Sequence, residues 1–384
     1  MPSQTKSILK LKRLFVDLNL QGAVETVRRL TGKGQIRQGY EILCLALGPR
    51  RFSPVEYYTE GLWRTDLSAE MRASIISEKQ SKEINRQLSP IDGDSLRGLL
   101  TDKLLTALTL RGAGFPVLAP RAIFGKVLRV PGVESLASEK EIASFLRREG
   151  TLPIFGKPLH ASLAIGAASY MSLADNGESI ILGDRRRVNL AALTSEIAGN
   201  FARGYVFEPV IRQHPDVERV TGPAVGGLRI VTLRTADDVE VLYTLHRLPA
   251  VGAMMDATSG ANPYTTAHID SETGRVIRAQ AMDSMEADGL VASLVNGVRF
   301  DNVVLPFMKE CHSLVLDVHR LLVRPGLLGF DLALTPDGPL ITEVNSNPYH
   351  TSYQHAAYRG FLNPDFRPKI EAAIAAVRAE SRKP

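Results

Sequence analysis

Two runs of alternating residues around a short turn constrain the fold of this chain most. The first run is GFDLAL at residues 329–334, the turn is TPDG, and the second run is PLITEVN at residues 339–345. Alternation around a turn that contains Pro and Gly predicts an antiparallel hairpin. Because alternate side chains of a strand share one face, we expect Asp331, Glu343 and Asn345 to converge on the same face of a sheet.

These three side chains offer two carboxylates and one amide oxygen. Hard oxygen ligands of this kind suit Mg²⁺, which keeps part of its water shell and takes further oxygens from phosphate groups. Two carboxylates buried among apolar neighbours without a cation would be costly. The sequence therefore predicts a magnesium site formed by Asp331, Glu343 and Asn345, and the alternative is that they are ordinary strand residues facing solvent.

Length and composition narrow the class of protein. A chain of 384 residues is too long for one ordinary core, so we expect two or three lobes. There is no run of about 18 apolar residues that would span a membrane, and polar residues interrupt the basic N-terminal stretch where a signal peptide would be apolar. We therefore expect a cytoplasmic protein. A net charge of +5 favours anionic ligands such as nucleotides but does not by itself indicate DNA or RNA binding.

Helical and strand patterns alternate along most of the chain, which predicts an α+β fold. The segment from residue 95 to the glycines near 114 reads as one helix, and Ser138 and Glu141 have the spacing of a capping box that opens another. We expect strands near 119–124, 152–158, 167–173, 179–183, 204–211, 225–234, 240–248 and 275–281, and further helices over 190–201, 303–323 and 368–381.

The N-terminal part is predicted to be helical. Residues 8–31 have an amphipathic pattern in which Ile8, Leu11 and Phe15 share one face, and a second helix is expected over 36–48. The first helix either docks on the body of the protein or lies on a partner or on anionic lipid, as a peripheral membrane contact.

A magnesium site of this kind calls for phosphate, yet the chain has neither a glycine-rich phosphate loop nor a dinucleotide fingerprint. Side-chain cations must then hold the phosphates, and Lys103, Lys157 and Arg229 are the candidates. The alternative for each is a surface side chain whose charged end reaches into water.

The run YVFEPVI at residues 205–211 suggests where a base would bind. Backbone groups of Val210 and Ile211 can pair with an adenine edge, and Glu208 can accept a hydrogen bond from its amino group. The alternative is an edge strand interrupted by Pro209.

In their order along the chain, TDKLLTALTLRGAGFPVLAP, LPIFGKP, YVFEPVIRQHP, VGGLRIVTLR and GFDLAL…LITEVNSNP resemble the ATP-grasp superfamily, and within it the sugar-transfer-associated proteins. The resemblance implies an ATP-grasp fold with two α+β lobes that clasp ATP and a helical N-terminal extension. It implies four regions: the helical N-terminal residues 1–90, a first lobe of helices and a strand over 91–150, a lid lobe over 151–210, and a C-terminal lobe with the metal site over 211–384.

The resemblance also implies a reaction and roles. An ATP-dependent ligase of this kind joins a small-molecule carboxylate to an amine through an acyl phosphate. ATP and Mg²⁺ would be its cofactors. The resemblance implies that Lys103 and Lys157 contact the phosphates, that Glu208, Val210 and Ile211 contact the adenine, and that His214 or Asp216 contacts the ribose. It also implies that Arg229 binds the γ-phosphate or the acyl phosphate, that Arg247 binds the substrate carboxylate or a phosphate, and that Asp331, Glu343 and Asn345 bind the metals.

Two other functions are compatible with the same residues. One is a phosphotransferase on the same fold, in which a hydroxyl attacks ATP and no amide forms. The other is a nucleotide-binding partner of a biosynthetic complex that performs no chemistry itself.

Overall fold

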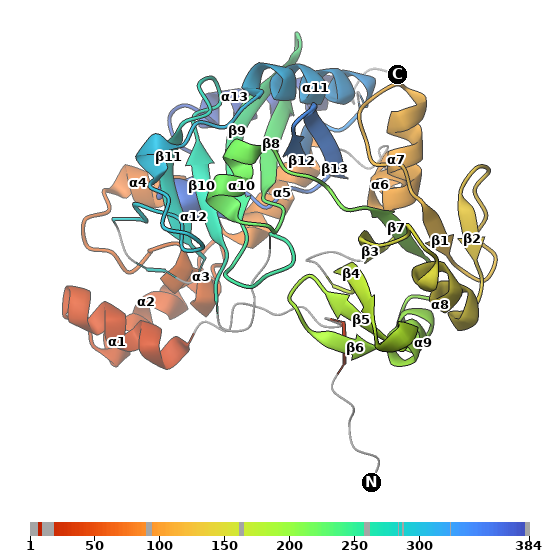
Figure 1. Cartoon of the computed structure of the whole chain (residues 1–384). Helices are drawn as coiled ribbons and strands as arrows, with labels where there is room; N and C mark the ends of the chain where they lie inside the picture. Colours follow the sequence, from red (N-terminus) through yellow and green to blue (C-terminus); the bar gives the residue numbers. More distant parts are fainter. Residues whose placement is uncertain are drawn as a thin grey trace.

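The computed structural model describes residues 7–9, 19–89, 94–160, 165–256, 262–282, 284–285, 288–322 and 324–380. Two β-sheets and the helices packed on them make up most of the chain, and the helices of residues 20–74 lie beside one of the sheets (Figure 1). The expected α+β class is confirmed. No helix among the described residues is long and apolar enough to cross a membrane.

The first sheet has seven strands in the order β2-β1-β7-β3-β4-β5-β6. Only β1 and β2 run parallel. Its strands are β1 (Ala122–Phe124), β2 (Glu134–Leu136), β3 (Ile154–Pro158), β4 (Ala168–Ala174), β5 (Ser179–Leu182), β6 (Arg187–Asn189) and β7 (Tyr205–Pro209). This sheet joins strands from both sides of residue 150, where the sequence suggested a boundary between lobes. Strand β7 lies between β1 and β3, so the alternative of an edge strand for YVFEP is wrong.

Two helices cover the first sheet. They are α8 (Glu139–Arg147) and α9 (Leu190–Asn200), whose apolar sides share one core with Phe124, Tyr170 and Phe207. Ser138 caps α8 by accepting from the Glu141 N–H, as the capping-box spacing predicts, but the Glu141 carboxylate accepts from Ala137 rather than from Ser138.

The second sheet has six strands in the order β11-β10-β9-β8-β12-β13, all antiparallel. They are β8 (Gly227–Arg234), β9 (Val239–Leu248), β10 (Thr265–Ile269), β11 (Val276–Ala281), β12 (Leu327–Thr335) and β13 (Gly338–Asn345). The predicted hairpin is confirmed, because β12 and β13 pair directly across the turn. Strand β10 was not predicted, and it lies between β9 and β11.

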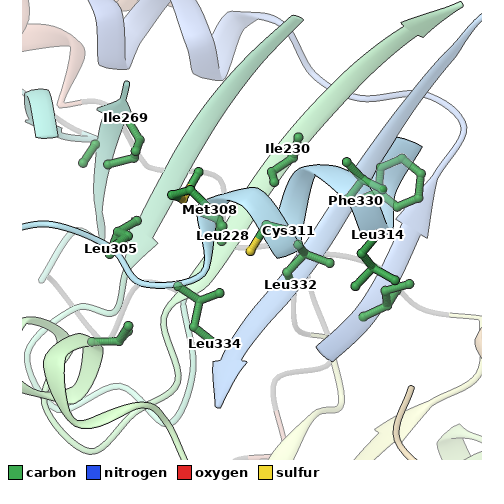
Figure 2. Packing of buried hydrophobic residues seen from close by; sticks show 14 of the residues in the cluster. Leu228, Ile230, Ile269, Leu305, Met308, Cys311, Leu314, Phe330, Leu332 and Leu334 are labelled. Atoms are coloured by element: carbon green, nitrogen blue, oxygen red, sulfur yellow. The ribbon is translucent and has the colours of Figure 1, made fainter. Parts of the chain in front are cut away.

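One face of the six-stranded sheet is buried by helix α11 (Met308–Leu321), as Figure 2 shows. Its side chains pack against the sheet residues that point to this face, among them Leu228, Ile230, Phe330 and Leu332. Burying each such side chain stabilises the fold by about 1.5–3 kcal/mol. The α11 packing therefore fixes which side chains of β8 and β12 point to the opposite face, since neighbours along a strand alternate.

The opposite face is divided between an apolar half and a charged half. Helices α5 (Glu78–Leu88), α12 (Thr351–Ala357) and α13 (Arg367–Glu380) cover the apolar half, which contains Val231, Leu233, Tyr243, Leu245 and Leu327. On the same face of the same strands, Arg229 and Arg247 lie two residues from Val231 and Leu245, and Asp331 lies four residues from Leu327.

The N-terminal helices form a small core of their own. Ala23 and Val27 of α1 (Leu20–Thr31) pack with Phe52, Tyr57 and Trp63, next to α2 (Gln35–Leu47), α3 (Pro54–Thr59) and α4 (Ala69–Ser74). The described part of the first predicted helix thus docks on the protein.

The predicted start of that first helix at residue 8 is wrong. Residues 7–9 are not helical, and residues 10–18, with Leu11 and Phe15, lie outside the described part. The backbone N–H groups of Ile8 and Leu9 instead donate to the Glu196 carboxylate of α9 at 2.8 and 2.7 Å.

The single helix predicted after residue 95 is two helices, α6 (Asp94–Thr101) and α7 (Lys103–Gly112). The break occurs because the Asp102 carboxylate accepts from the N–H groups of Leu104 and Leu105, both at 3.0 Å, and so begins a new helix. A short helix that was not predicted, α10 (Pro215–Thr221), follows the first sheet.

A buried histidine under the six-stranded sheet predicts a pH-dependent stability. Nε2–H of His319 donates to the Pro325 carbonyl at 2.8 Å, and Nδ1 accepts from the Thr232 hydroxyl at 2.6 Å. Burial lowers the pKa of His319 to about 4. Between about pH 6.5 and 4 the unfolded chain therefore binds a proton that the folded chain does not, and acid weakens the fold.

We expect wild type to exceed a His319→Gln variant in free energy of unfolding at pH 7, and this difference to shrink at pH 5. Urea unfolding at both pH values measures it, and taking the difference between the two proteins cancels the other titrating groups. A difference that does not change with pH would contradict the assignment.

Candidate active site

The strand register brings the predicted metal ligands to one face of the six-stranded sheet. Asp331 of β12 is paired with Glu343 of β13 on one side and with Arg229 of β8 on the other. A bulge follows this pair, and the Thr342 hydroxyl donates to the Asp331 carbonyl at 3.0 Å. The Asn345 side-chain N–H donates to Asp331 Oδ2 at 3.4 Å, which leaves its amide oxygen for another partner. The three side chains that the sequence predicted together are thus adjacent.

Two arginines neutralise the central carboxylate. Arg229 donates to both oxygens of Asp331 in a fork, with Nη2 at 2.7 Å from Oδ2, and Arg247 Nη2 lies 3.1 Å from Oδ1. Asp331 is 4% exposed. Burial raises the pKa of this carboxyl, but the charges of Arg229 and Arg247 and the bonds from Arg229 outweigh burial and hold the pKa below its usual range. Asp331 is therefore an anion at neutral pH.

Glu343 has its own cation. Nζ of Lys103, the first residue of α7, lies 3.2 Å from Glu343 Oε1. The Asp102 cap that divides α6 from α7 also fixes where Lys103 emerges from the chain. Lys103 of helix α7 thus forms an ion pair with a residue of the edge strand β13. The sequence did not predict this contact.

Asp256, which the sequence analysis did not identify as a site residue, belongs to the same charged group. Its Oδ2 lies 2.7 Å from Arg247 Nη2. Burial raises the pKa of Asp256 to about 6, against the opposing effect of Arg247. Gly227 lies close beside it, and a Cβ there would lie 2.6 Å from Asp256 Oδ2, so a larger residue would displace this carboxylate. The pair of glycines in VGGLR was the one sequence signal for this close approach.

The seven-stranded sheet carries a second pair of opposite charges. Lys157 of β3 and Glu208 of β7 lie on adjacent strands, with Nζ of the lysine 2.8 Å from Oε2 of the glutamate. Their side chains are 13% and 6% exposed. Two of the residues predicted to contact a nucleotide thus touch each other.

The remaining predicted nucleotide contacts lie just after β7. Val210 and Ile211 are half-buried and outside any strand. His214 caps α10, where its Nδ1 accepts from the Asp216 N–H at 3.2 Å, and its ring packs edge-to-face on Phe307. Asp216 is exposed. Within the described part of the chain, no hydrogen bond or ion pair joins His214 or Asp216 to the charged group around Asp331.

The donor set fits a hard divalent cation. No three His, Cys, Asp or Glu side chains come together as a metal site among the described residues, and the Asn345 amide oxygen is the further oxygen beside Asp331 that the sequence predicted as a ligand. Two carboxylates and one amide oxygen are the kind of ligand that suits Mg²⁺. Both carboxylates are paired with protein cations, which a metal would replace.

Four carboxylates and four cations are thus joined in ion pairs, three of each around Asp331 and one of each on the seven-stranded sheet. They are Asp331, Glu343, Asp256 and Glu208 with Arg229, Arg247, Lys103 and Lys157. Such an arrangement suits a ligand that combines phosphate groups with a divalent cation. The phosphates would bind the lysines and arginines, and the metal ion would bind the carboxylates.

The central ion pair predicts a cost in stability that its surface counterparts lack. In an Asp331→Asn variant, shape is kept but Arg229 loses its carboxylate inside the protein, so we expect the free energy of unfolding to fall by about 3–5 kcal/mol. The control is Asp365→Asn, which breaks the exposed pair with Arg359 and should cost about 1 kcal/mol or less. Urea unfolding at pH 7 without nucleotide compares them, and equal losses would show that the buried pair is not special.

Comparison with known proteins agrees with the resemblance noted from the sequence. Residues 171–365, just over half of the chain, match the model of the sugar-transfer associated ATP-grasp family. No curated protein matches the chain.

Several solved structures are similar at low sequence identity. The D-alanine-D-alanine ligase from Coxiella burnetii shows 14% identity and a TM-score of 0.40, with 74% of this chain and 60% of that chain covered. The VanG D-Ala:D-Ser ligase from Enterococcus faecalis shows 13% identity and a TM-score of 0.42, with 73% and 61% covered. The L-amino acid ligase from Bacillus licheniformis shows 12% and 0.35, with 71% and 48% covered. The match thus spans about 60% of the length of the first two structures. On the extent of the family match, this chain is a member of the sugar-transfer associated ATP-grasp family.

Proposed function

We propose that the protein is an ATP-dependent ligase that joins a carboxylate to an amine through an acyl phosphate. The observation that supports it most is the matched set of charges around Asp331, since it offers separate partners for phosphate and for magnesium. Family membership supports the use of ATP. The lobes proposed from the sequence, with a lid over residues 151–210 and a metal-binding lobe over residues 211–384, would close around the nucleotide.

The nucleotide would be held by side chains from both sheets. Lys103 and Lys157 leave Glu343 and Glu208 to bind the phosphates, and ammonium groups that exchange a carboxylate for a phosphate keep a charge-assisted bond. Glu208, released from Lys157, accepts from the adenine amino group next to Val210 and Ile211. His214 or Asp216, at the start of α10, would bind the ribose.

Asp331, Glu343 and Asn345 would hold Mg²⁺. When bound, the ion neutralises the negative charge that builds on the transferred phosphoryl group. The chain's own contribution is to place two carboxylates and one amide within the reach of a single ion, through the register of β12 and β13. Arg229, which pairs with Asp331 in the free protein, is then free to meet the γ-phosphate.

The chemistry proceeds in two displacements. A substrate carboxylate oxygen attacks the γ-phosphorus, the bond to the bridging oxygen of ADP breaks, and ADP leaves with that electron pair. The amine then attacks the acyl carbon, phosphate departs, and the amine gives up a proton as the amide forms. Arg247 would bind the substrate carboxylate or a phosphate, and its half-buried guanidinium, held by Asp256 beside Asp331, supports this role.

The decisive assay measures ADP formation with MgATP across a panel of acids and amines. We expect ADP release to require an acid and an amine together, with an amide as product. ADP release with a hydroxyl compound alone would indicate a phosphotransferase, and tight ATP binding without any turnover would indicate a partner that performs no chemistry. Either result would overturn the proposal.

Removing one metal ligand tests the site itself. We expect Glu343→Gln to lower kcat at least about 100-fold, because several kcal/mol of transition-state stabilisation depend on the cation that it holds. The control is Glu240→Gln, which sits in the same sheet but pairs with Lys369 at the surface. Unfolding in urea checks that both variants are folded. Unchanged kcat in Glu343→Gln would remove the metal assignment.

A further inference from the structure

A cavity of about 970 Å³ lies outside the charged group, between the N-terminal helices and the region around α12. Helices α3 and α4 form one wall, and α12 with the segment that follows it forms the other. Much of the wall is apolar or aromatic, from residues that include Tyr58, Leu67, Met71, Ile75, Tyr358 and Leu362. A volume of this size accommodates a small organic molecule.

One carboxylate in this cavity has no counter-ion. Glu60, at the end of α3, accepts at Oε2 from the Gln354 side-chain N–H at 2.8 Å. No lysine, arginine or histidine of the described residues forms an ion pair with it. Its side chain keeps some exposed surface because it borders the cavity, yet protein atoms surround it so deeply that burial raises its pKa to about 8. A carboxylate in this position gains most from a cation that the protein does not supply.

The arginines of the cavity already have partners. Arg64 is held by Asp66 and stacks at 4.1 Å over the Tyr358 ring. Arg359 is 2.7 Å from Asp365, and Arg367 donates to the Leu362 carbonyl. Arg64 and Arg359 are therefore neutralised by carboxylates of the protein, whereas Glu60 is a carboxyl group for which a ligand would have to supply the cation.

The cavity lies beside the candidate active site. Gln280 of β11 borders it and is paired through Thr266 of β10 with Arg247 of β9. Directly paired residues point to the same face, and adjacent strands are about 4.8 Å apart, so the backbones at Gln280 and Arg247 lie about 10 Å from each other on one face. The cavity and Arg247 are thus separated by the width of two strands, with the buried side chain of Thr266 between them.

We propose that this cavity holds an amine-bearing organic substrate, with its ammonium group against Glu60 and its apolar body against the tyrosine, leucine and methionine side chains of the wall. As a substrate pocket it rests on the ligase function proposed above; as a binding site for an organic ammonium it does not. The apolar wall would contact an apolar body of the ligand, and Glu60 would pair with its ammonium group.

The first test is binding without ATP, so that its outcome is independent of turnover. Phenethylamine and 2-phenylethanol have nearly the same shape, and only the first carries a charge at pH 7. By calorimetry on the full chain, we expect the amine to bind at least tenfold more tightly than the alcohol. Equal affinities would overturn the proposal without the need for any variant.

The second test removes the carboxylate. Glu60→Gln keeps an oxygen that accepts from Gln354, so the fold should persist, and we expect its affinity for phenethylamine to fall at least tenfold while that for 2-phenylethanol stays the same. The matched control is Glu70→Gln, an exposed carboxylate on the same cavity wall, which should bind the amine as wild type does. Equal losses in both variants, or no loss in Glu60→Gln, would contradict the assignment.

Proton release gives a signature that a merely structural Glu60 would not show. Because the free carboxyl has a pKa of about 8, binding an ammonium at pH 7 should drive its proton off, and binding should tighten as the pH rises from 6.5 to 8.5. The other groups facing it are Glu56 on α3, His355 on α12, Arg64 and Glu70. Comparing wild type with Glu60→Gln in buffers of different ionisation enthalpy isolates Glu60. The same release in both proteins would overturn the proposal.

The turnover assay then separates the two proposals. If the ligase function holds and the cavity is its amine pocket, Glu60→Gln should raise the KM for the amine and leave the KM for ATP unchanged. Amine binding that depends on Glu60 but no ligase turnover would refute the function and the substrate role, and keep the ammonium site. Turnover with an unchanged KM for the amine would refute the pocket and keep the function.

Discussion

The forked ion pair between Arg229 and Asp331 is the interaction on which the rest of the site depends. It joins the neighbouring strands β8 and β12 on a face that would otherwise need apolar cover. Taking two charges out of water is expensive, and their attraction offsets this only with good geometry and further bonds. Here Arg247 and Asn345 supply those bonds, and α11 on the other face fixes the register that brings all of them together. The packing of α11 on one face of the sheet thus determines which charged side chains meet on the opposite face.

The pairing of opposite charges also explains how these residues can bind a ligand that carries both negative phosphates and a positive metal ion. Without a ligand, Lys103 neutralises Glu343 and Lys157 neutralises Glu208, so each of these four side chains has a partner of opposite charge. Magnesium with a triphosphate offers each carboxylate a cation and each cation an anion. We infer that nucleotide binding replaces the ion pairs within the protein by ion pairs with the ligand. The free energy cost of burying these charges then stays low in both the free and the bound protein.

The sequence predicted the adjacency of Asp331, Glu343 and Asn345 better than it predicted their surroundings. Strand alternation around the TPDG turn was enough to place Asp331 and Glu343 on one face, because period and turn chemistry are local properties. Partners across the sheet were out of reach: the contact of Lys103 with Glu343 joins residues 240 positions apart, and the register that pairs Arg229 with Asp331 depends on the packing of α11. These are tertiary facts that no local pattern contains.

Three misses have local physical reasons. Strand β10 reads TTAHI, and its polar residues hid a central strand whose neighbours, not its own composition, bury it. The break between α6 and α7 depends on a single cap, Asp102, inside an otherwise helical pattern. Glu60 and Gln354 are 294 positions apart, so the cavity between them was not visible in the sequence.

The most direct measurement is a crystal structure with a non-hydrolysable ATP analogue and Mg²⁺. We expect oxygens of Asp331, Glu343 and Asn345 about 2.0–2.1 Å from one metal ion or its close neighbour, with Lys103 and Lys157 moved from their carboxylates onto the phosphates. A nucleotide bound while the pairs of Lys103 with Glu343 and Arg229 with Asp331 persist, and with no metal between these side chains, would contradict the exchange of partners and the ligase function built on it.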